Sequence, residues 1–102
     1  MTNLYEETLW VLRYHEKDAR DVIWVGDGVN SYTWGEFREA AYHFYYDKGY
    51  GIQEVKPKLV IVGDNWWLER REYDGSEWWE FVTRPTKPLD RKNKPELRLG
   101  AE

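Results

Sequence analysis

The chain has 102 residues, with 19 acidic and 15 basic side chains and no cysteine. This length suits one ordinary domain. The lack of cysteine excludes disulfides, thiolate metal sites and cysteine nucleophiles. The net charge of −4 argues against broad, direct binding to nucleic acid. No apolar run approaches the roughly 20 residues of a membrane span and no basic region precedes one at the start, so a soluble cytoplasmic protein without membrane contacts is expected.

The first predicted element is a helix over residues 2–17. Asn3 or Thr2 can cap its start, and Glu6 and Glu7 suit the positive end of the helix dipole. Apolar residues recur at helical spacing and predict a buried stripe made of Tyr5, Leu9 and Leu12.

A hairpin and a second helix are predicted next. The hairpin covers residues 22–33, with a two-residue turn at Asp27–Gly28. The helix covers residues 33–49, begins with a capping box at Thr33–Glu36 and ends at a glycine. Its expected inward face consists of Phe37, Ala40, Ala41 and Phe44.

The continuous apolar run Leu59–Gly63 predicts a central strand covered on both faces. A long hairpin follows, so the element order is αββαβββ and the fold class is α+β, with a mainly antiparallel sheet and two helices on one face. We expect this single domain to cover residues 1–85. Residues 86–102 are rich in charge and proline and predict a flexible tail, with a short helix over 95–100 on binding as the alternative.

The hairpin NWWLERREYDGSEWWEF allows two registers. A two-residue turn at Asp74–Gly75 would oppose like charges, Glu72 with Glu77 and Glu69 with Glu80, which is unfavourable. A three-residue loop over Tyr73–Gly75 avoids both clashes and is the predicted register. It places Arg71 opposite Glu77, Arg70 opposite Trp78, and Trp67 opposite Phe81.

Adjacent tryptophans on a strand point to opposite faces. The predicted core face carries Trp67, Trp79 and Phe81, and the predicted accessible face carries Trp66, Leu68, Arg70, Glu72, Trp78 and Glu80. On that second face, the arginine stems could simply cover the tryptophans. Alternatively, the face binds a partner, because Trp, Tyr and Arg are the preferred hot-spot residues.

The segment YDKGYGIQEVKPKLVIVGDNWWLERREYDGSEWWEFVTRP, from Tyr46 to Pro85, resembles small uncharacterised proteins of phages and integrated mobile elements of Gram-positive bacteria. In those proteins a YD-x-GYG-x-x-EV loop precedes an LVIVG strand and an EYDGSEWW hairpin. The resemblance implies a mobile-element accessory protein that acts in the cytoplasm of a bacterial cell. It implies no catalytic residue.

Few side chains are candidates for catalysis or for binding a metal ion or a phosphate. His15 and His43 lack a metal-binding spacing and are expected to be partly exposed helix residues. The GDG and GYG glycines lack the context of a phosphate loop. We therefore expect no catalytic residue, no metal ligand and no cofactor.

Three functions remain. The first and preferred one is a non-enzymatic binder of a host or phage protein, such as an inhibitor of a defence nuclease, because an acidic protein can occupy a basic groove. The second is a small-molecule or nucleotide binder that uses aromatic stacking. The third is an enzyme of unidentified type. The aromatic surface could equally be the interface of a homodimer. The candidate binding residues are Trp66, Arg70, Trp78, Tyr45, Tyr46 and Tyr50.

Overall fold

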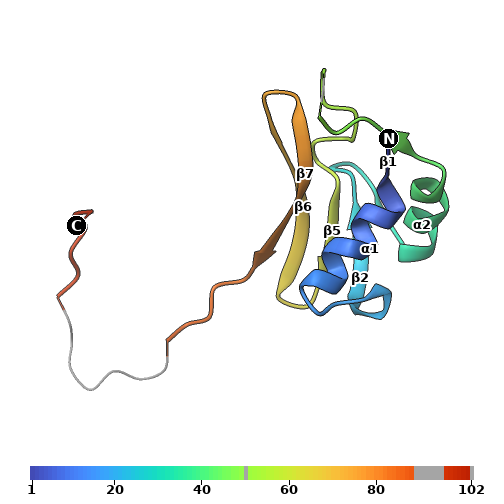
Figure 1. Ribbon diagram of the computed structural model, residues 1–102. Coiled ribbons are helices and arrows are strands. Elements are labelled where there is room, and N and C mark those ends of the chain that lie inside the picture. Colours follow the sequence, from blue (N-terminus) through green and yellow to red (C-terminus); the bar gives the residue numbers. More distant parts are fainter. Residues whose placement is uncertain (50, 89–95, 102) are drawn as a thin grey trace.

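The computed structural model describes residues 1–49, 51–88 and 96–101. Two helices lie on one side of an antiparallel sheet (Figure 1), which confirms the predicted α+β class. The elements in chain order are β1 (Thr2–Asn3), α1 (Leu4–Tyr14), the 3₁₀ helix η1 (Ala19–Asp21), β2 (Val22–Gly26), β3 (Ser31–Tyr32), α2 (Trp34–Tyr42), β4 (Tyr45–Tyr46), β5 (Val60–Gly63), β6 (Trp66–Tyr73) and β7 (Ser76–Thr83).

The predicted caps start both helices. The Asn3 side chain accepts the backbone N–H of Glu6 at 2.9 Å, and Thr33 and Glu36 form a reciprocal capping box. Helix α1 ends at Tyr14, earlier than predicted, because Glu16 adopts a left-handed backbone with φ 61°.

Helix α2 ends at Tyr42, so the prediction that it reaches residue 49 was wrong. The next residues form β4, which pairs antiparallel with β1 in a small two-stranded sheet. This pairing is between residues far apart in the sequence, and it overrides the local helical pattern of the aromatic segment.

The main sheet has the strand order β3-β2-β5-β6-β7, and every neighbouring pair is antiparallel. Strand β5 therefore lies in the centre, as predicted. Both helices pack on the same face of this sheet (Figure 1), which we call the inner face. The prediction that β5 is covered on both faces was wrong, since Val60 and Val62 face the other side and stay partly exposed.

The first hairpin turns through four residues, because Gly26 pairs with Ser31. The predicted two-residue turn at Asp27–Gly28 was therefore wrong. The Asp27 carboxylate organises the longer loop by accepting the backbone N–H groups of Val29 and Asn30 at 2.9 and 2.8 Å. It also accepts the Tyr32 hydroxyl at 2.9 Å.

These bonds make the loop pH-sensitive. The N–H groups of Asn30 and Val29, followed by the Tyr32 hydroxyl, hold the pKa of Asp27 far below its usual value. A lowered folded-state pKa stabilises the fold above the unfolded pKa of about 4, and this contribution is lost as the pH falls further. We expect Asp27→Ala to lower the melting temperature at pH 7, with a smaller difference from wild type at pH 3. Thermal melts at both pH values measure this, and an equal difference would contradict it.

The long hairpin adopts the register with a two-residue turn, which was not the predicted one. Tyr73 pairs with Ser76, Glu72 with Glu77 and Glu69 with Glu80. The turn is the two-residue Asp74–Gly75 step, whose φ angles of 52° and 88° are those of a type I′ turn. The predicted three-residue loop was therefore wrong. The opposed glutamates are tolerated because each has its own donor: Glu77 pairs with Arg70, Glu72 accepts the Gly75 N–H, Glu69 pairs with Arg71 and Glu80 accepts the Trp78 indole N–H.

The face prediction was right for β7 and inverted for β6. Trp79 is buried and Trp78 is 37% exposed, as expected. On β6, however, the buried residues are Trp66, Leu68 and Arg70, whereas Trp67 lies on the opposite face. A strand alternates strictly, so one wrong step in the pairing moves every side chain of the strand to the other face.

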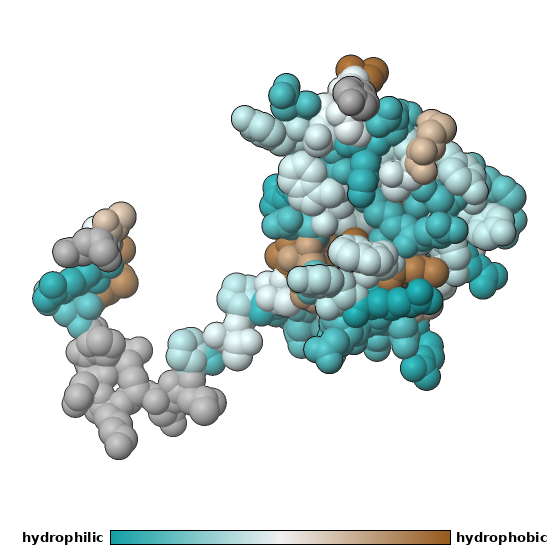
Figure 2. Space-filling view, viewed as in Figure 1, coloured by the Kyte–Doolittle hydropathy of each residue, from teal (hydrophilic) through white to brown (hydrophobic). Residues whose placement is uncertain are grey.

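The core lies between the helices and the inner face. Its buried apolar side chains are Leu4, Val11, Leu12, Val25, Phe37, Ala41, Tyr46, Val55, Ile61, Trp66, Leu68 and Trp79. From the viewpoint of Figure 2, hydrophilic and intermediate side chains cover most of the domain, and an apolar band lies in the middle.

The chain leaves the domain after β7, where the Arg84 N–H donates to the Asn65 carbonyl at 2.8 Å. Residues 84–88 and 96–101 form no helix or strand and are exposed. The helix considered for residues 95–100 is thus not formed over its described part. The rest of the predicted tail lies outside the described residues.

Candidate functional site

The structure separates the six candidate binding residues. Trp66, Arg70 and Tyr46 are at most 5% exposed, so their predicted place on an accessible surface was wrong. Trp78 and Tyr45 are exposed, on β7 and β4 respectively. Tyr50 lies outside the described residues. The tyrosines thus form no stacking platform in the described part of the chain.

Arg70 and Tyr46 do come together, but in a closed polar cluster under α1. Arg70 Nη2 donates to Glu77 Oε1 at 2.9 Å and to the Tyr46 hydroxyl at 2.9 Å, and Nη1 lies 3.5 Å from Glu7 Oε1. The Tyr46 hydroxyl donates to Glu7 at 2.5 Å. The Arg70 guanidinium also stacks over the Trp79 ring, 4.8 Å from its centroid.

This buried cluster has a structural role. Burial and the hydrogen bond to Glu7 raise the pKa of Tyr46, so its hydroxyl remains a proton donor. The Glu77 carboxylate also accepts the backbone N–H groups of Glu54 and Val55, at 2.7 and 3.2 Å, and so fixes the loop before β5. None of Glu7, Tyr46, Arg70 or Glu77 lines the pocket where α1 meets α2 or the groove between α2 and β2.

The accessible aromatic surface lies on the sheet face opposite the helices, which we call the outer face. Directly paired residues form one apolar row across four strands: Trp24 on β2, Val62 on β5, Trp67 on β6 and Val82 on β7. Trp24 is 41% exposed and the other three are half-buried. The Trp24 ring lies over Gly26, where an added Cβ would come within 2.5 Å of it.

Charged residues flank this apolar row. Glu69 and Glu80 are paired on the next row, and Arg71 and Trp78 lie beyond them. Arg71 Nη2 contacts Glu69 at 3.0 Å. The outer face therefore has an apolar row, with Glu69, Glu80 and Arg71 beside its β6–β7 part and the exposed ring of Trp78, a composition typical of an interaction surface with a polar rim.

The sequence predicted an accessible aromatic face on the long hairpin, but with the wrong residues of β6. On β6, Trp67 and Arg71 stand where Trp66 and Arg70 were expected, while Trp78 is where it was predicted. Trp24 was missed because the hairpin predicted over residues 22–33 was not assigned an inner and an outer face. A pairing of β2 with β5 would have identified it, but this contact lies almost 40 residues apart.

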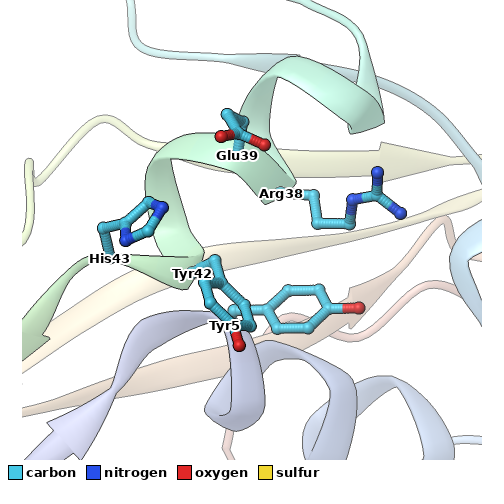
Figure 3. Close-up of a pocket in the computed structure, with 5 residues that line it drawn as sticks. All are labelled: Tyr5, Arg38, Glu39, Tyr42 and His43. Atoms are coloured by element: carbon cyan, nitrogen blue, oxygen red, sulfur yellow. The ribbon is translucent and has the colours of Figure 1, made fainter.

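A smaller pocket of about 360 Å³ lies where α1 meets α2, lined by Tyr5, Arg38, Glu39, Tyr42 and His43 (Figure 3). In Figure 3 the Arg38 and His43 side chains lie on opposite sides of the pocket, and Glu39 lies at the top of the view. No hydrogen bond links these five described side chains. The arrangement offers no nucleophile–base pair.

His15 also lacks a chemical partner of that kind, since its ring stacks on Phe81 with 3.9 Å between centroids. Within the described residues there is no cluster of three or more side chains suited to hold a metal ion. None of the described helices has the length and apolar character needed to cross a bilayer.

Comparisons of the chain with protein-family models, with curated proteins and with solved structures found no match.

Proposed function

We propose that this chain is a non-enzymatic binding protein that uses the outer face of its sheet to hold a protein with a basic surface. The observation that carries the proposal is the apolar row from Trp24 to Val82, which crosses four strands and is covered by no described element. An exposed apolar patch of this kind marks an interaction site more often than a chance surface.

Charge supports a basic partner. Residues 1–83 carry 9 Lys and Arg against 16 Asp and Glu, which gives a formal net charge of −7. The border of the apolar row includes Glu69 and Glu80. Such a surface attracts a partner with positive charge around an apolar centre and repels an acidic one.

The resemblance to mobile-element proteins narrows the class of partner. A protein that handles nucleic acid has a basic groove, because it must neutralise phosphate charge. We infer that a nuclease of a bacterial defence system fits both the charge and the context. The chain would then act as an accessory inhibitor in the cytoplasm of the host cell.

The test is capture of a partner from bacterial lysate by the immobilised full chain. Trp24→Ala with Trp78→Ala is expected to abolish capture of a near-stoichiometric protein, since a hot-spot tryptophan contributes about 2 kcal/mol or more. The matched control is Trp10→Ala with Tyr14→Ala, because these α1 rings are 66% and 70% exposed and lie away from the sheet. Capture should also weaken as salt rises.

Two outcomes would overturn this function. One is capture that survives the sheet variant but fails in the helix control. The other is a wild-type homodimer in sedimentation that the sheet variant converts to a monomer, because the outer face would then bind a second copy of the chain.

A further inference from the structure

A groove separate from the pocket at α1 lies on the inner face of the sheet. It is bounded by α2, β2, β3 and the segment that precedes β5. Its volume is about 680 Å³, within the range of about 300–1,000 Å³ that is usual for small-ligand sites. It shares no lining residue with the outer face described above.

The floor of this groove is apolar. It is formed by buried core side chains, namely Leu4, Val25, Phe37, Ala41 and Val55. One wall continues the apolar stripe of α2 through Ala40 and Phe44, which remain exposed. The stripe on α2 is thus wider than the core that it covers, and apolar surface is left open to a ligand.

The rim of the groove is acidic. Asp27, Glu36 and Glu54 line it, and Lys56 is the one basic residue among the described lining residues. Lys56 Nζ lies 3.4 Å from Asp27 Oδ2, so the positive charge of the rim is directed at a carboxylate that is already well bonded. Glu36 and Glu54 form no ion pair within the described chain, although each accepts a backbone N–H.

This charge pattern selects among ligands. A nucleotide or another anion would meet an excess of two negative charges at the rim. An ammonium group would instead gain charge-assisted hydrogen bonds to carboxylates.

The wall of the groove formed by residues 54–56 is fixed by hydrogen bonds to a buried side chain. Glu54 and Val55 donate their backbone N–H groups to Glu77, whose side chain is fully buried and paired with Arg70. A buried ion pair is a costly means of anchoring a loop. It gives the groove a preformed wall, which lowers the ordering cost of binding.

We propose that this groove binds a small organic cation. The apolar body of the ligand, aromatic or aliphatic, lies on the floor between α2 and β2. Its ammonium group lies at the rim next to Glu36 and Glu54. This inference concerns a surface separate from the outer face and does not depend on the protein partner proposed above.

The test uses two probes that share an indole ring and a two-carbon linker but carry opposite charges, tryptamine and indole-3-propionate. Each is titrated into the ¹⁵N-labelled full chain and followed by amide chemical shifts. Tryptamine is expected to shift Ala40, Phe44 and Val55 with saturation, and to bind about tenfold more tightly than indole-3-propionate, which corresponds to about 1.4 kcal/mol.

Two variants separate charge from shape. Glu36→Gln with Glu54→Gln keeps one acceptor oxygen in each side chain and removes both charges, so the preference for tryptamine should fall below about twofold. Ala40→Trp fills the groove from an exposed helix position and should abolish saturation by both probes.

The proposal is overturned if wild type binds both probes equally, if the double variant keeps the tenfold preference, or if shifts appear only on the outer face. Because the double variant is judged by a ratio of two affinities, the test remains decisive where Ala40→Trp does not fold.

Discussion

Arg70→Ala is expected to destabilise the domain by about 3–5 kcal/mol, the cost of removing one partner from a buried ion pair. The side chain of Arg70 is fully buried, and so is that of Glu77, which it contacts at 2.9 Å. Without the guanidinium, Glu77 and the nearby Glu7 would remain in the core with no cation beside them.

The loss is not confined to one pair. Arg70 also donates to Tyr46 on β4 and stacks on Trp79 on β7. Through Glu77 it reaches the N–H groups of Glu54 and Val55. One side chain therefore ties together the hairpin, the small sheet and the loop before β5, and its removal should reduce the cooperativity of unfolding as well as its free energy.

Urea unfolding followed by circular dichroism measures the effect. The matched control is Arg71→Ala, one residue along the same strand, whose side chain is 55% exposed and contacts Glu69 on the surface. A surface ion pair contributes at most about 1 kcal/mol, so this variant should remain close to wild type. Equal losses in the two variants would show that Arg70 is not the buried anchor described above.

Local signals predicted the helix starts and the kinds of element. The Thr33–Glu36 capping box depends on residues three apart and forms as expected. The antiparallel sheet and its central strand also follow from apolar runs separated by turns. The ends of the helices could not be predicted in the same way, because the end of α2 depends on pairing between β4 and β1.

The hairpin register could not be obtained from opposed charges alone. The like-charge penalty between cross-strand residues is about 1 kcal/mol or less. A favoured Asp74–Gly75 turn and the contact of Glu77 with Arg70 outweigh it. The contact between Arg70 and Glu77 could not be predicted from the two strands alone, because it requires the Glu77 side chain to point into the core.

The same error shifted the candidate site by one residue along β6. The face of β6 that carries Trp66, Leu68, Arg70 and Glu72 is amphipathic, and it was predicted to be the accessible one. In the structure this face of β6 is inside, where Arg70 Nη2 donates to Glu77 and Tyr46 and the Glu7 carboxylate lies 3.5 Å from Nη1. On the accessible outer face, Trp67 of β6 lies in one row with Val62, Val82 and Trp24, and Trp24 comes from a strand that is distant in the sequence.

The tryptophans of β7 provide the second large expected effect. Trp79→Ala should cost about 3–5 kcal/mol, as for other buried aromatic side chains. Its ring is 5% exposed, and its indole N–H donates to Thr8 Oγ1 at 2.9 Å. The truncation would leave a cavity under α1 and would remove the aromatic surface on which Arg70 stacks.

Trp78→Ala, at the next position, should cost less than about 1 kcal/mol, because this ring lies on the outer face and is 37% exposed. The two variants delete the same side chain from adjacent positions of one strand, so they differ only in the face that is lost. In a domain of this size, 1 kcal/mol corresponds to about 4–8 °C in melting temperature. Thermal melts should therefore separate them by more than 8 °C.

The stability of Trp78→Ala is also what allows the outer face to be tested for binding. A variant that keeps its melting temperature but loses the captured protein has lost a contact rather than a fold. If Trp78→Ala instead melts as early as Trp79→Ala, the outer face is part of the packed structure and the partner must bind elsewhere. If Trp79→Ala melts like wild type, the inner and outer faces of β7 have been assigned the wrong way round.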